Sequence, residues 1–146
     1  MKLNKGLIRV LALCLIISLT FPLSVSAATI ETVQPYASRY LTSYNTYICD
    51  MGGGRIEIWY DVTGTGDMDE IGVLSIILYE SSDNSTWTRV KTYSHQNYSS
   101  MLAYDDWCHT SYVSYQGTAG KYYKAYVCIW AGKNGGGDTR YMWATM

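Results

Sequence analysis

The stretch that decides the fold is residues 55–62, which read RIEIWYDV. Apolar and polar side chains alternate along it with a period of two, which predicts a β-strand with one face against a core and the other toward solvent. The inward side chains are Ile56, Ile58, Tyr60 and Val62. The outward side chains are Arg55, Glu57, Trp59 and Asp61.

A second strand of this kind is predicted for residues 121–131, where the same alternation runs for five periods. Its inward residues are Tyr123, Ala125, Val127, Ile129 and Ala131. Its outward residues are Tyr122, Lys124, Tyr126, Cys128 and Trp130. The lysine among the outward residues marks that face as the solvent side, because a lysine is almost never fully buried without a partner.

Weaker strand signals recur about every ten residues, separated by clusters of Gly, Asn and Ser. They cover residues 46–50, 71–79, 86–94, 108–115 and 139–145, with a short edge strand around Leu102. No stretch has a helical period over three turns. The sequence therefore predicts an all-β chain folded as an antiparallel β-sandwich of about seven strands.

The first 27 residues have the composition of a secretory signal peptide. Bases without acids precede an apolar run at 10–21, and small residues at 24–28 predict cleavage after Ala27, with Ala28 as the alternative. A transmembrane anchor is disfavoured because the run is short for a bilayer. We expect a secreted or cell-surface protein that has no membrane span once the leader is removed. Its predicted parts are a leader at 1–27, an N-terminal arm or linker at 28–44 and a β-domain at 45–146.

The charge of the chain argues against nucleic acid as a partner. The 146 residues hold 11 Lys plus Arg and 12 Asp plus Glu, and removal of the leader takes three of the bases. A mature chain with a net charge of −4 has no large overall positive field to hold nucleic acid or an anionic membrane surface.

Three cysteines follow the leader, and an exported protein can form disulfides. Cys108 and Cys128 are equally distant from Thr118, which lies in a turn-like segment, so a hairpin would place them opposite each other as a disulfide. A sandwich in which the two strands lie in different sheets would not place these cysteines opposite each other. If the two do pair, Cys49 is a free thiol, either inert or the link of a covalent dimer.

Two resemblances bear on the fold. Residues 115–120 (YQGTAG) and 123–127 (YKAYV) look like the closing hairpin of an immunoglobulin-like or fibronectin type III module. The whole mature chain resembles a family of small secreted proteins of Gram-positive bacteria, on GGG at 52–54, VTGTG at 62–66, MDEIG at 68–72, STW at 85–87 and residues 115–120. The resemblances imply an exported bacterial β-domain and supply no catalytic residue.

Neither catalytic nor metal-binding spacing is found in the sequence. His95 and His109 have no nucleophile or second ligand at a suitable spacing. Acidic residues gather at 67–70 and 105–106, the kind of loop that calcium or a carboxylate-based hydrolase needs, but without an EF-hand pattern. We predict no metal, no cofactor and no enzymatic activity. The alternative is a small secreted hydrolase or toxin-like effector that uses the acidic loops.

The remaining feature is an excess of aromatic residues, 15 tyrosines and 5 tryptophans. Those on the predicted solvent faces include Trp59, Trp130, Tyr122 and Tyr126. Exposed rings of this kind bind sugars or proteins, which predicts a non-enzymatic binding or surface-associated module for a glycan or a protein. Two other interpretations stay open: rings that only pair across strands, and a structural protein cross-linked through a free cysteine.

Overall fold

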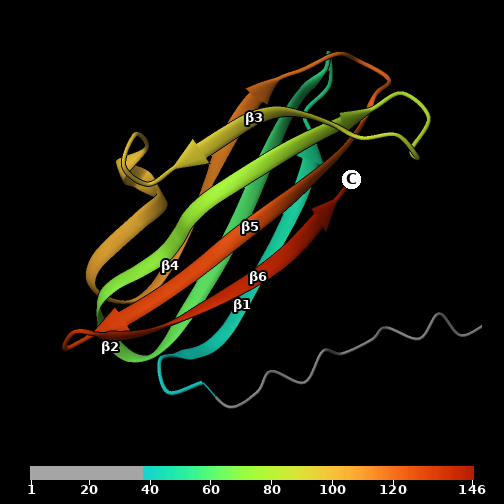
Figure 1. The fold of residues 1–146 in the computed structure, drawn as a ribbon. Coiled ribbons are helices and arrows are strands. Elements are labelled where there is room, and N and C mark those ends of the chain that lie inside the picture. The colour runs from blue at the N-terminus through green and yellow to red at the C-terminus, as the bar shows by residue number, and fades with distance from the viewer. Residues whose placement is uncertain (1–37) are drawn as a thin grey trace, which may run out of the picture. The chain divides into compact units, whose positions relative to one another are not determined.

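The structure, a computed structural model, describes residues 38–146 (Figure 1). The predicted leader, and the predicted arm up to residue 37, lie outside the described residues. The elements are β1 (Leu41–Asp50), β2 (Arg55–Ser81), β3 (Thr88–Ser94), the short 3-10 helix η1 (Ser99–Met101), β4 (Leu102–Gln116), β5 (Tyr122–Lys133) and β6 (Gly136–Thr145). Within this range no helix is long and apolar enough to cross a bilayer.

The six strands form one antiparallel sheet that curls into a half-barrel around the core (Figure 1). Strand β2 is 27 residues long and organises it. The first part of β2 lies between β1 and β4, and its second part lies between β5 on one side and β4, then β3, on the other. Strand β6 continues the sheet beyond β5.

The change of partner along β2 occurs at Gly72. This residue is the last one of β2 that pairs with β4, opposite Leu102, and pairing with β3 begins at Ser75. Gly72 has a φ of +142°, and a Cβ there would lie 2.3 Å from the carbonyl oxygen of Met101. Only glycine has both the backbone freedom and the small volume that this close approach of Met101 to β2 requires.

The prediction of an all-β antiparallel fold is confirmed, but the prediction of about seven strands is wrong for the described residues, which form six. Residues 55–62 and 71–79 belong to one strand, because the Thr-Gly-Thr-Gly-Asp segment at 63–67 bends the chain without ending it. The predicted edge strand at Leu102 and the strand at 108–115 are likewise one strand, β4. Strand β1 begins at Leu41, within the segment predicted as the arm at 28–44.

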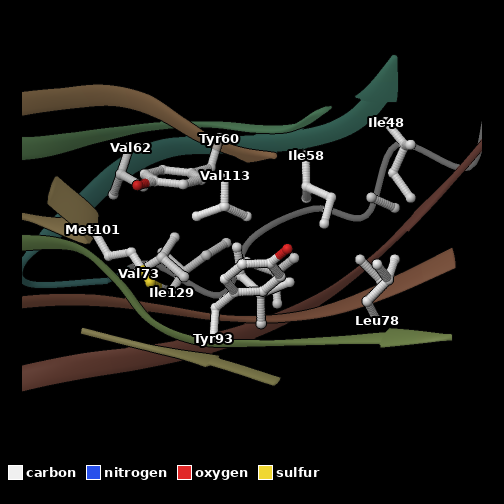
Figure 2. Close-up of a cluster of buried hydrophobic side chains, with 14 of the residues drawn as sticks. Ile48, Ile58, Tyr60, Val62, Val73, Leu78, Tyr93, Met101, Val113 and Ile129 are labelled. Carbon is white, nitrogen blue, oxygen red and sulfur yellow. The ribbon is translucent and has the colours of Figure 1, made fainter. Parts of the chain in front are cut away.

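The predicted inward faces of residues 55–62 and 121–131 are confirmed, since all nine of those side chains are buried. Figure 2 shows Ile58 and Tyr60 of β2 facing Tyr93 of β3 across the core. Buried tyrosines keep their hydroxyl groups hydrogen-bonded, as burial of a polar atom demands. Tyr60 donates to the carbonyl of Ser100 at 3.1 Å, and Tyr93 donates to that of Ser114 at 2.7 Å.

These buried tyrosines predict a loss of stability in alkali. Burial raises the pKa of Tyr93 to about 12, from an ordinary value near 10. The unfolded chain therefore releases this proton at lower pH than the native chain does, so stability is complete below pH 10 and falls as the pH rises through 12. Denaturant unfolding measured between about pH 9 and pH 12 is expected to show a decrease in the free energy of unfolding. In the Tyr93→Phe variant the free energy of unfolding is expected to decrease less steeply with pH. An identical slope in the variant would contradict the prediction.

Candidate functional site

A group of aromatic side chains covers the outer face of the sheet, the face opposite the core, where β2, β5 and β6 lie side by side. We call it the outer aromatic cluster. Its members are five rings and the lysine that lies among them, namely Tyr79, Trp87, Tyr126, Tyr141, Trp143 and Lys124. The strand register brings them together: Lys124 lies opposite Tyr79 on β2, and Tyr126 lies opposite Trp143 on β6. Residues directly opposite on paired strands share a face and touch. Trp87 joins from the segment before β3.

Four rings of the cluster are in contact with one another, and two of the four are exposed to solvent. Tyr126 stacks on Tyr141 with centroids 5.4 Å apart and planes inclined by 10°, and its centroid lies 4.8 Å from that of Trp143. Trp143 in turn lies 5.7 Å from Tyr79. Tyr141 and Trp143 nevertheless keep 59% and 51% of their surface exposed. The face thus presents a continuous aromatic surface rather than scattered rings.

A lysine lies within this surface. The ammonium group of Lys124 is 4.3 Å from the ring centroid of Trp87, 4.9 Å from that of Trp143 and 6.0 Å from that of Tyr79. Each of these distances allows a cation–π attraction, which holds the flexible side chain in place. Among residues 38–146, the two salt bridges are Arg55–Glu57 and Arg140–Asp138, so no carboxylate of this part neutralises Lys124.

Trp59 belongs to a separate aromatic row on the first part of β2. It is stacked between Tyr47 of β1, with centroids 6.3 Å apart, and Tyr112 of β4, at 4.6 Å. Its indole N–H donates to Glu57 at 3.1 Å, and Glu57 is only 6% exposed. The prediction that Glu57 meets water is therefore wrong, because Arg55 and the row of rings cover it. Trp59 thus lies between two rings that cover its faces.

Trp130 and Tyr122 also lie outside the outer aromatic cluster. The indole of Trp130 lies against Gly132 and Gly137, where an added Cβ would come within 2.6 Å and 2.2 Å of the ring. Its N–H donates to Glu70 at 3.1 Å. Tyr122 is exposed at the other end of β5, opposite Ser81. Of the four predicted binding residues, only Tyr126 is in the cluster.

Four rings of the cluster were not among the predicted binding residues: Tyr79, Trp87, Tyr141 and Trp143. Tyr79 ends a nearly continuous apolar run, in which periodicity cannot assign a face. For Tyr141 and Trp143 a signal was available, because they alternate with the half-buried Met142 and the buried Ala144. This alternation identifies the outward rings of β6, but their place in the cluster depends on β6 lying at the sheet edge beside β5, which the sequence pattern does not show.

The three cysteines are free thiols in the structure. The prediction that a hairpin places Cys108 opposite Cys128 is wrong, because β4 and β5 pair with opposite sides of β2 and not with each other. Cys128 is buried between Ser75 and Tyr141, and burial raises the pKa of its thiol. A covalent dimer through Cys49 stays a prediction.

The acidic segment at 67–70 is tied into local hydrogen bonds. Asp69 accepts the backbone N–H of Asn134 at 2.6 Å, and Glu70 accepts the Trp130 indole. Both line an open pocket of about 370 Å³ together with Tyr104. In residues 38–146, no three His, Cys, Asp or Glu side chains are grouped to hold a metal ion.

Both histidines contact backbone carbonyl groups. His95 Nδ1 lies 3.1 Å from the carbonyl oxygen of Leu74, and His109 Nε2 lies 2.8 Å from that of Ser100. A carbonyl oxygen only accepts hydrogen bonds, so each of these ring nitrogens acts as a donor. These contacts fasten the connection between β3 and β4 to the sheet, which is a structural role.

No known protein family, curated protein or solved structure matches the chain. The resemblance to small secreted Gram-positive proteins and to immunoglobulin-like or fibronectin type III modules therefore stays a prediction.

Proposed function

We propose that this chain is a secreted, non-enzymatic binding module that holds a glycan on the outer aromatic cluster. The observation that carries the proposal is the continuity of the cluster, in which exposed Tyr141 and Trp143 contact Tyr126 and Tyr79. Sugar rings carry apolar C–H faces that pack on aromatic rings, which add contact area at low entropic cost. The predicted leader and the likeness to exported immunoglobulin-like domains fit this role.

A glycan suits this face better than a protein partner does. The residues beside the rings on the same face are small and hydroxylated, namely Ser75 of β2, Thr92 of β3 and Thr145 of β6. They offer hydrogen-bond donors and acceptors to sugar hydroxyl groups. Protein interfaces depend more on apolar anchors packed at their centre, and the aliphatic residue on this part of the face is Ile77.

The proposal predicts that Trp143→Ala removes glycan binding without unfolding the protein. Half of the Trp143 surface is exposed, and its ring contacts Tyr126 and Tyr79, so truncation is expected to lower the free energy of unfolding by about 1–2 kcal/mol and to leave the protein folded. Loss of a central ring from a binding surface costs about 2 kcal/mol, or roughly thirtyfold in affinity. Affinity gel electrophoresis of the mature protein on a panel of soluble neutral and acidic polysaccharides measures the retardation.

The matched control is Trp107→Ala. Trp107 is 57% exposed on β4 and has no ring contact with the cluster, so its removal tests tryptophan loss alone. We expect Trp107→Ala to be retarded like the wild type. If no polysaccharide retards the wild type, or if both variants are retarded equally, a glycan-binding cluster is ruled out. Retention of the wild type only on protein-coated surfaces would indicate a protein ligand instead.

A further inference from the structure

We infer that the glycan bound by the outer aromatic cluster is acidic, a polysaccharide whose carboxylate groups pair with Lys124. The inference rests on the proposed function and specifies its ligand. A bound sugar ring would lie on Trp143 and Tyr141 while its carboxylate receives a charge-assisted hydrogen bond from the Lys124 ammonium group. Such bonds are about twice as strong as neutral ones.

The position of Lys124 favours this assignment. Its ammonium group is fixed among Trp87, Trp143 and Tyr79, so a ligand would not have to immobilise a free lysine chain on binding. No acidic side chain of residues 38–146 competes for it at salt-bridge distance. Rings that surround a cation also lower its exposure to water, which strengthens its attraction to an incoming anion.

A second base flanks the cluster. Arg89 of β3 is exposed and lies opposite Tyr79, on the same outer face. The acidic residues close by in sequence are Glu80 and Asp83. The Glu80 carboxylate accepts the Tyr123 hydroxyl at 2.6 Å. The Asp83 carboxylate, in the turn before Trp87, accepts the backbone N–H groups of Thr86 and Ser85 and the Ser81 hydroxyl, and these bonds hold its pKa below the ordinary range. Asp83 is thus committed to its own turn.

The distribution of charge along the chain gives an independent reason. The two segments that contain the cluster, residues 79–94 and 121–146, hold six bases and three acids. The other described segments, residues 38–78 and 95–120, hold two bases and eight acids. A polyanion would therefore be repelled less by the two segments that contain the cluster than by the other described segments.

The test compares polygalacturonate with its fully methyl-esterified form, which has the same backbone without the charge. Calorimetric titration of the mature wild type is expected to show that the acid binds at least tenfold more tightly than the ester. The reason is that only the acid accepts a charged hydrogen bond from the lysine. Lys124→Met, which removes the charge and keeps an unbranched side chain one atom shorter, is expected to lose about tenfold for the acid and little for the ester. Hyaluronan serves as a second acidic probe.

The matched control is Lys133→Met, which removes the same charge from the far end of β5, where the lysine contacts the backbone carbonyl of Asp67. We expect it to bind both forms like the wild type. Equal binding of acid and ester, or equal effects of the two lysine variants, would overturn the acidic assignment and leave glycan binding intact. If Trp143→Ala binds every polymer as well as the wild type does, the proposed function itself fails.

Discussion

Gly72→Ala is expected to lower the free energy of unfolding by about 4 kcal/mol, which is most of the stability of many small domains. Two costs combine at this position. An alanine at a φ of +142° is strained by about 1–3 kcal/mol. Its Cβ would also come within 2.3 Å of the Met101 carbonyl oxygen, a backbone atom that cannot move aside as the end of a flexible side chain can. Overpacking of this kind costs a further 1–3 kcal/mol, roughly.

The control for this prediction is Gly66→Ala on the same strand. Gly66 is exposed, and no heavy atom would lie within 4 Å of an added Cβ. We expect its unfolding free energy to change by less than about 1 kcal/mol. Urea unfolding followed by tryptophan fluorescence measures both variants. If Gly72→Ala is as stable as Gly66→Ala, Met101 approaches β2 less closely than the structure has it.

Local alternation was enough to predict the nine inward side chains of the two clearest strands, but it placed the buried Glu57 and Cys128 on the outward face. In residues 55–62 and 121–131, each outward residue is flanked by inward ones, and a one-residue slip would turn the core face toward water. The continuity of β2 could not be predicted in this way. The glycines at 64 and 66 are ordinary turn signals, and only pairing with partners distant in sequence keeps the chain extended there.

The candidate site was predictable in kind but not in membership. An outward tryptophan or tyrosine can be found from strand parity, as Tyr126 was. Whether its ring stays available depends on the cross-strand neighbour, and that depends on strand order. Trp59 is stacked between Tyr47 and Tyr112, which are each 45% exposed, whereas Tyr126 meets Tyr141 and Trp143, which are 59% and 51% exposed. Two residues of equal pattern therefore have different ring neighbours because of tertiary pairing.

Trp130→Ala gives the second large effect, and it distinguishes a structural ring from a binding ring. The indole covers the glycine pair Gly132 and Gly137 of β5 and β6, which have no side chains of their own to pack. Aromatic cover of this kind stabilises glycines in a sheet. Removing the ring also leaves Glu70 without its 3.1 Å partner. We expect a loss of about 3 kcal/mol in the free energy of unfolding.

A double-mutant cycle with Gly137→Ala tests the contact directly. In the wild-type background the new Cβ would lie 2.2 Å from the indole, so this variant is expected to be destabilised by about 1–3 kcal/mol. In the Trp130→Ala background the space is open, and the same substitution is expected to be neutral or stabilising, since glycine weakens a strand. Additive effects would show that ring and glycine do not interact. Glycan retention should be unchanged in the Trp130→Ala variant while it stays folded, because Trp130 contacts no ring of the outer aromatic cluster among the described residues.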